Sequence, residues 1–502
     1  MKKNNKLGNC LVGLVGFSCV IIYLLIVLIN LREGLFFWFW PIMFAVATLI
    51  FIFIKFGKKI IAYIREHRKT FKIIGIVLIV LGFMLRLMFL CFQGEIYTNS
   101  LKSDTGVHWN GAQQIVDEGS LGQDIGEYEA VFPYLTSYTG LLAIAMMIFG
   151  KGYFAVVFLN ILFDVICCVA LFILFSKWKK RKSVGLLAVV IWALNPLEII
   201  FCSLPLAIVV TNTFVIISVL LIYLVFCHRS SLVKLAGTSM ITGIVLACGN
   251  FFRPIFIVFL LAILVHWFII SLDEKQYKGA VLSCGVLIGG YLVTGLLSGP
   301  IYSAFNPYYD GEKSEAGWSF YLGANYDTRG EWNIEDRDDF FGDYFEEANN
   351  DIHAAHGIAM EKGLERYGAL IAEGRIFNHL MNKMTVLFGD VQGSIYDVNY
   401  YLHVSKEGKN YRILQDSVMT FYVLLLLTLG YCIINITRRK NKYERWKGSF
   451  MLFLMILIIG LLSASLLVEV MNRYSLPFIT LMIIIALGLV FSDDTQKRKD
   501  MI

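Results

Sequence analysis

Two polar segments carry carboxylates beside apolar runs, where a carboxylate can do acid–base chemistry. Asp104 stands in NSLKSDTGVHWNGAQQIVDEGS, and Glu127 and Glu129 stand in GEYEAVFPYLTSYTG, where the chain returns to an apolar run. Such groups can act as a general base or share a divalent metal ion. The alternatives are a helix N-cap or solvated loop acid for Asp104 and solvated charge for Glu127. Asp104 and Glu129 are therefore the candidate catalytic residues, and a divalent metal at Asp104 is possible but not required.

Three cationic side chains also border apolar runs. They are Arg253 in GNFFRPIF, Arg473 in VEVMNRYSLPF and Lys383 in NHLMNKMTVLF. An arginine so close to hydrocarbon is costly and usually has a partner or an anionic ligand. Because guanidinium geometry suits phosphate, we expect Arg253 and Arg473 to bind one, and the Lys383 ammonium to join them. The alternative for Arg473 is an i,i+4 pair with Glu469 on one helical turn. The supporting candidates are His108, Tyr128, Glu469 and Tyr474.

Other polar patterns are weaker. Arg86 lies inside an apolar run and is expected to pair with an acid or to extend its charge to the interface. His353 and His356 share the i,i+3 spacing but lack a third metal ligand, so exposed helix surface is expected. The 10 cysteines form no CxxC pattern and are expected to pack within helices. No phosphate-binding loop motif occurs, which argues against an ATP-driven pump acting alone.

The composition places these residues in an integral membrane protein. Of 502 residues, 57% are hydrophobic and 16% are charged, against about a quarter charged in soluble proteins. A crossing needs about 20 apolar residues, and lipid offers no hydrogen bonds, so each must be a helix. The sequence predicts an all-α fold with about 12–13 spans. The apolar runs are 10–30, 35–54, 73–92, 134–149, 153–175, 184–202, 205–227, 232–249, 253–271, 279–299, 415–436, 448–468 and 474–491.

Charge in the loops predicts the orientation of the spans. Three basic loops are expected in the cytoplasm, and the acidic segments 93–133 and 300–351 are expected outside. Two runs, 134–149 and 153–175, then lie between the outer loop 93–133 and the inner loop 176–183. If both runs crossed the membrane, the two loops would be on the same side. We expect 134–149 to be a re-entrant or interfacial helix, which gives twelve spans and two cytoplasmic termini. The alternative is that one basic loop breaks the rule. The basic loops are 55–72, 176–183 and 438–447.

Four regions follow from this pattern. Residues 1–72 hold two additional N-terminal helices and a basic loop, and residues 73–299 form the transmembrane core with the first outer loop 93–133. Residues 300–414 form an extracytoplasmic region with one or two amphipathic helices. Residues 415–502 hold the last helices and a cytoplasmic tail.

The order of these features resembles the GT-C superfamily of membrane glycosyltransferases, which includes protein O-mannosyltransferases and lipid A aminoarabinose transferases. The resemblance covers most of residues 73–491. The pair of adjacent acids found in some of these families is absent, because Thr105 follows Asp104. The segments that carry the resemblance are, in order, FMLRLMFL, SDTGVHWNGAQQIVDEG, VFPYLTSYTGLLAIAMMIFGKGY, FLNILFDVICC, ALNPLEIIF, NFFRPIFIVF, YLGANYDTRGEWN and NRYSLPFI.

The resemblance implies a GT-C-like fold in a bacterial cell membrane, with the active site outside the cytoplasm. It implies a polyprenyl-phosphate sugar donor and a glycan, lipid or protein acceptor. Asp104 matches the first-loop aspartate, the family's general base or metal-binding residue, and Arg253 and Arg473 would hold the donor phosphate. The alternatives are a lipid or polysaccharide flippase and an envelope glycan polymerase. Membrane lipids are expected partners, and nucleic acid is not.

Overall fold

The computed structural model describes residues 6–32, 67–88, 104–228, 231–274, 277–311, 316–395, 409–437 and 449–491. Within these ranges the chain is helical and contains no β-strand. The all-α expectation is therefore confirmed for the described residues. Two predicted segments lie outside these ranges: the span 35–54 and residues 93–103, which are the part of the first outer loop before Asp104.

Among the described residues, nine helical segments are long and apolar enough to cross a membrane. This confirms a multi-pass helical protein, while the total of twelve or thirteen crossings stays a prediction. The nine are α1 (Lys6–Arg32), α3 (Arg68–Met88), α7 (Tyr153–Trp178), α10 (Ile208–Cys227), α11 (Leu232–Phe252), α13 with α14 (Tyr277–Gly295 and Ser298–Phe305), α21 (Lys409–Thr437), α23 (Phe450–Leu467) and η4 with α24 (Asn472–Ser475 and Leu476–Val490).

Three further helices have shorter apolar stretches. They are α6 (Tyr134–Phe149), α8 (Lys182–Ala193) and α12 (Phe256–Glu274), whose apolar stretch ends at Leu272. The apolar run 184–202 is not one helix, because α8 is followed by the short helix α9 (Pro196–Phe201). Pro196 lacks the N–H that a continuing helix needs, and the Asn195 side chain caps α9 by accepting from the N–H of Leu197.

The spans expose apolar side chains on the sides that no other helix covers. On α3, the exposed side chains include Ile73, Ile76, Val77 and Val80. Exposing such a row to water would be unfavourable, whereas lipid solvates it without cost. The spans therefore present a hydrocarbon-compatible surface around a packed interior.

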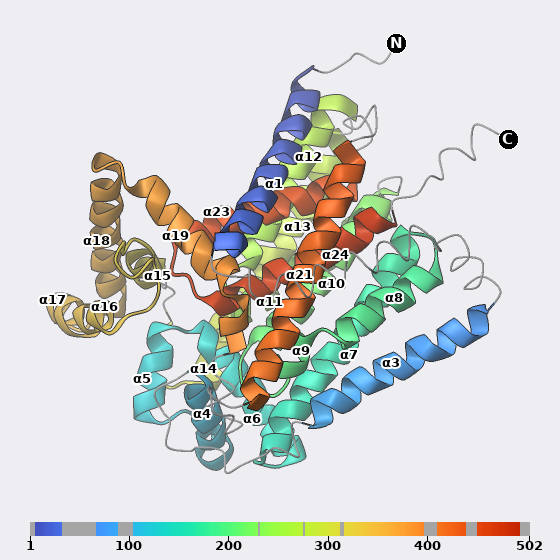
Figure 1. Ribbon diagram of the computed structural model, residues 1–502. Helices are drawn as coiled ribbons and strands as arrows, with labels where there is room; N and C mark the ends of the chain where they lie inside the picture. The colour runs from blue at the N-terminus through green and yellow to red at the C-terminus, as the bar shows by residue number, and fades with distance from the viewer. Residues whose placement is uncertain are drawn as a thin grey trace.

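The polar loops fold into short helices at one end and one side of the bundle (Figure 1). In the figure, α15, α16, α17 and α18 project from the bundle, and α4 and α5 lie at its lower end. The loop helices are α4 (Asp104–Glu118), α5 (Gln123–Val131), α15 (Ala316–Gly323), α16 (Ile334–Asp338), η2 (Asp339–Tyr344), α17 (Phe345–Glu347), α18 (Ile352–Ala372), α19 (Ile376–Gly389) and η3 (Val391–Ile395).

An aromatic core packs α5, α15, η2 and α18 together. Phe132, Trp318 and Phe340 are buried in it, and the Phe340 ring centroid lies 5.1 Å from that of His356. His356 is itself buried and accepts a hydrogen bond from the N–H of Trp318. The expectation of an exposed helix surface is therefore wrong for His356, because α15 packs over that face of α18.

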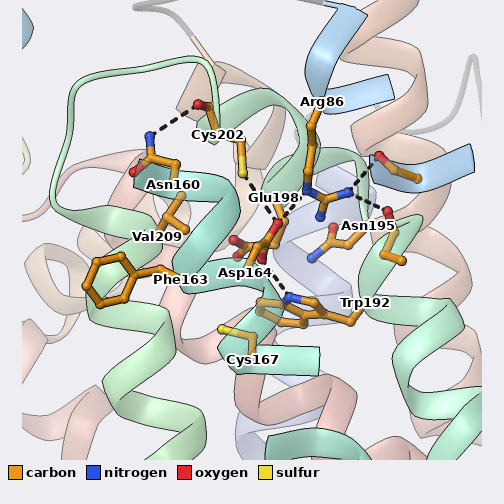
Figure 2. A network of polar contacts seen from close by, with 12 residues as sticks. Arg86, Asn160, Phe163, Asp164, Cys167, Trp192, Asn195, Glu198, Cys202 and Val209 are labelled. Atoms are coloured by element: carbon orange, nitrogen blue, oxygen red, sulfur yellow. Dashed lines mark hydrogen bonds and ion pairs between the residues drawn. The ribbon is translucent and has the colours of Figure 1, made fainter. Parts of the chain in front are cut away.

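A buried polar cluster joins α3, α7 and α8 (Figure 2). Arg86 forms an ion pair with Asp164 and donates to the carbonyl oxygen of Ala193 at 2.6 Å. Asp164 also accepts from the indole N–H of Trp192 at 2.8 Å and from the Cys202 thiol at 3.3 Å. Arg86 therefore pairs with an acid, as one of the two sequence-based alternatives predicted. We call these five residues the buried cluster.

Candidate active site

Six of the nine candidate site residues line one cavity of about 770 Å³. They come from segments separated by more than 350 positions in the sequence. Tyr128, Glu129 and Lys383 are outside this lining. The residues of the cavity's charged end are Asp104, His108, Arg253, Glu469, Arg473 and Tyr474.

Asp104 and Arg473 form an ion pair in this cavity. Asp104 is the first residue of α4, and its negative charge is favourable at a helix N-terminus. Arg473 lies in η4, at the start of the span that continues into α24. Their side chains are 37% and 14% exposed, so the pair stays open to the cavity.

Arg253 reaches the cavity because α11 ends immediately before it. The backbone of Arg253 is extended, with φ −159° and ψ 127°, as a residue before proline prefers. Pro254 follows and cannot continue the helix. The Arg253 guanidinium carbon lies 4.0 Å from the centre of the Tyr474 ring, a cation–π contact. Two guanidinium groups therefore face one space.

Glu469 occupies the extended segment between α23 and η4. Met471, at the end of this segment, has φ −137° and ψ 154°, so Glu469 and Arg473 do not share a helical turn. The alternative of an i,i+4 pair on one helical turn is therefore wrong. Burial raises the pKa of Glu469 to about 7, and the positive charge of Arg473 opposes this rise.

His108, Thr139 and Glu129 form a chain of polar contacts behind the cavity wall. His108 Nδ1 lies 2.8 Å from the Thr139 hydroxyl, which donates to the Glu129 carboxylate. Burial lowers the pKa of His108 to about 4 and raises that of Glu129 to about 7. His108 is therefore neutral at pH 7. Thr139 connects Glu129 to His108, which does line the cavity.

Tyr128, the other supporting candidate outside the lining, lies close to the same charges. Burial is the largest cause that raises the pKa of its phenol, and the negative charges of Asp104 and Glu469 raise it further. Its ring packs edge-on against Phe132, with centroids 5.3 Å apart. Tyr128 thus connects the aromatic core of the loop helices to the charged end of the cavity.

Lys383 lies on α19, and its ammonium is hydrogen-bonded to backbone carbonyl groups. Its ammonium donates to the carbonyl oxygens of Gly323 and Val468 at 2.8 and 2.7 Å, and to the Tyr367 hydroxyl at 3.3 Å. Burial lowers the pKa of Lys383 to about 7, and the nearby Glu469 charge opposes this shift. In this geometry Lys383 joins the loop helices to the segment that carries Glu469.

The rest of the cavity is mainly apolar and is built by the spans. None of its remaining polar groups was a candidate from the sequence alone. Asn250 was detectable because it stands three positions before Arg253, at the end of α11, whereas Tyr291 lies within a span and carries no local signal. The apolar lining includes Leu206, Phe251, Ile257, Leu292, Leu461 and Phe478, and the additional polar lining includes Asn250, Tyr291, Tyr302, Ser319 and Ser465.

This arrangement can hold an amphiphile with an anionic head. Guanidinium groups bind phosphate well, and apolar walls accommodate a hydrocarbon chain. The described residues contain no group of three or more His, Cys, Asp or Glu side chains placed to hold a metal ion.

No protein-family model, no curated protein and no solved structure matches this chain. Residue roles therefore rest on the chemistry and geometry of the chain itself.

Proposed function

We propose that this protein is a membrane glycosyltransferase that moves a sugar from a polyprenyl-phosphate donor to an acceptor in the cell envelope. The acceptor is a glycan, a lipid or a protein, and the reaction takes place on the extracytoplasmic side. One observation carries the proposal: two arginines and two carboxyl groups face a cavity whose remaining walls are mainly apolar. The GT-C-like order of sequence motifs supports the same reaction.

The arginines suit the leaving group of such a transfer. When the bond between the sugar and the phosphate breaks, negative charge grows on the phosphate. Arg253 and Arg473 are fixed before the substrate arrives, one on the Tyr474 ring and one by Asp104. Preorganised positive charge in a partly dry site stabilises this developing charge without reorganisation.

The apolar walls suit the polyprenyl chain. They belong to α10, α11, α12, α13, α23 and α24, so they continue from the charged end of the cavity into the spans. A lipid-linked donor can therefore keep its tail in hydrocarbon while its phosphate reaches the arginines. A nucleotide sugar would gain nothing from these walls.

A carboxylate must take the proton of the acceptor hydroxyl. The resemblance gives this role to Asp104, and the position of Glu129 beside an apolar run makes it a second candidate. Asp104 lines the cavity, whereas Glu129 is fully buried and hydrogen-bonded to Thr139. The geometry therefore favours a carboxyl group of the cavity over Glu129.

The test uses the full chain in vesicles supplied with radiolabelled polyprenyl-phosphate sugars and an envelope extract as acceptor. We expect release of polyprenyl phosphate, and Arg473→Ala is expected to slow it roughly 100- to 1,000-fold because the fixed positive charge is lost. Arg337→Ala is the matched control, since Arg337 is exposed and pairs with Asp338 away from the cavity lining.

The alternatives predict other results. A flippase would move the labelled lipid between leaflets and leave the sugar attached, which is measured by protecting the lipid from a membrane-impermeant reagent. Equal release from Arg473→Ala and Arg337→Ala would overturn the assigned site. No release from the wild type with any offered donor would overturn the proposed reaction.

A further inference from the structure

Two carboxyl groups face the cavity, and their surroundings differ. Asp104 is held in an ion pair by Arg473. Among the described residues, the Glu469 carboxylate receives one hydrogen bond, a long one of 3.5 Å from the Tyr474 hydroxyl. Most lone pairs of Glu469 are therefore available to a substrate hydroxyl. The lone pairs of Asp104 that face Arg473 are not available to a substrate, because they accept from that guanidinium.

We propose that Glu469, and not Asp104, takes the proton from the acceptor hydroxyl, while Asp104 positions Arg473. This inference rests on the proposed glycosyl transfer. It assigns separate roles to two groups that the sequence analysis treated as a base and a supporting residue.

The backbone on both sides of Glu469 is fixed. Its own N–H donates to the carbonyl oxygen of Ser319 at 2.6 Å, and the N–H of Val470 donates to that of Gly330 at 2.9 Å. On the preceding residue, the Val468 carbonyl oxygen accepts from Lys383. These hydrogen bonds come from α15, the turn that follows it and α19, so the carboxyl group is presented by a braced segment.

The charged side chains around Glu469 come from several elements. The positive charges of Arg473 and Arg253 favour its ionised form, and Asp104 opposes it. Burial has the largest effect and brings the pKa to about 7. A general base works best when its pKa lies near the working pH. The remaining titratable groups that face Glu469 are Tyr128, Lys383 and Tyr474.

The proposed step conserves atoms and charge. The acceptor oxygen attacks the anomeric carbon of the donor sugar and forms the new glycosidic bond. The bond between that carbon and the phosphate oxygen breaks, and its electron pair leaves with the polyprenyl phosphate near Arg253 and Arg473. The hydroxyl proton passes to the Glu469 carboxylate, which later releases it to water.

This proton transfer requires an ionised Glu469. For a base with a pKa of about 7, the ionised fraction rises as the pH rises and levels off above that value. The logarithm of kcat/KM should therefore increase with a slope of about one below pH 7 and reach a plateau above it.

The experiment measures release of polyprenyl phosphate as a function of pH for the wild type, Glu469→Gln, Glu469→Asp, Asp104→Asn and Glu361→Gln. Glu469→Gln should lower kcat roughly 100- to 10,000-fold and abolish the acidic limb, which is the rise of kcat/KM with pH below pH 7. Glu469→Asp should keep this acidic limb, although its rate should be lower than that of the wild type. Glu361→Gln, on an exposed part of α18, is the matched control and should behave as the wild type.

Asp104→Asn decides between the two carboxyl groups. We expect it to lower the rate while the acidic limb persists. If Asp104→Asn abolishes the limb and Glu469→Gln retains it, the inference is wrong and the proposed function stands. Binding of donor to Glu469→Gln, measured with labelled lipid, shows that this variant is folded. If the wild type releases no polyprenyl phosphate, both the inference and the proposed function fail.

Discussion

Two arginine–carboxylate pairs lie in this molecule, and they differ in access to solvent. In the buried cluster, Arg86 and Asp164 are both 0% exposed. At the cavity, Arg473 and Asp104 are 14% and 37% exposed. The same two chemical groups therefore occur once sealed between helices and once open to a space that can admit a ligand.

The sealed pair is suited to structure. Asp164 accepts three hydrogen bonds, from Arg86, Trp192 and Cys202, so protein donors replace the water that it lost. Neither Arg86 nor Asp164 lines the cavity. The pair thus holds α3 against α7 and α8, and no substrate can compete for it.

The open pair is suited to exchange. A phosphate that enters the cavity can bind Arg473 alongside Asp104, because both partners are reached without unfolding. A partly exposed ion pair contributes less to stability than a sealed one, so a change in it costs little. Solvent access, and not the identity of the pair, therefore separates a binding arginine from a structural one.

The largest expected effect is on the buried cluster. Arg86→Met leaves the charge of Asp164 buried without its partner, which should lower the free energy of unfolding by about 3–5 kcal/mol. Thermal unfolding of the detergent-solubilised protein measures it. The double variant Arg86→Met with Asp164→Leu is the control and should recover most of the loss. A single variant as stable as the wild type would show that this pair does not hold α3.

A smaller effect is expected at His108, which lines the cavity but is buried. Its pKa of about 4 lies below the 6.5 of an exposed histidine. Below pH 6.5 the unfolded chain takes up a proton that the folded chain refuses, so stability falls as the pH drops from 6.5 to 4. In His108→Asn this contribution, about 1.4 kcal/mol per pH unit, should be missing from the unfolding curve. Parallel curves for the two proteins would contradict burial of a neutral imidazole.

The smallest expected effect on stability is at the open pair. Asp104→Asn removes a partly exposed ion pair, so the free energy of unfolding should change by less than about 1 kcal/mol. The comparison with Arg86→Met, measured by the same thermal unfolding, tests the distinction directly. Equal destabilisation by the two variants would show that the sealed and the open pair contribute equally to stability.

Several features of the fold were predictable from local sequence. The apolar runs predicted helices because a backbone in lipid must satisfy its own hydrogen bonds. The exception, 184–202, breaks at Asn195 and Pro196, and that break was readable from the same residues. The positions of Asp104 and Arg253 next to apolar runs were enough to select them as candidates.

Partner choice was not predictable in the same way. An acidic partner was one of the two alternatives for Arg86, but nothing local identifies Asp164, which lies 78 positions later in the chain. Arg473 was given Glu469 as its helical alternative, although that segment is extended and Asp104 arrives from 369 positions away. Lys383 was expected at a phosphate and is instead occupied by carbonyl groups.

By itself, the sequence determined that this chain is a bundle of membrane-compatible helices and that its turns carry a small set of carboxylates and arginines. Those properties depend on runs of neighbouring residues. Only the tertiary structure decided which of these side chains share a cavity and which are sealed against one another. Distances between helices depend on the packing of the whole chain, and a change of a few ångströms turns a binding group into a structural one.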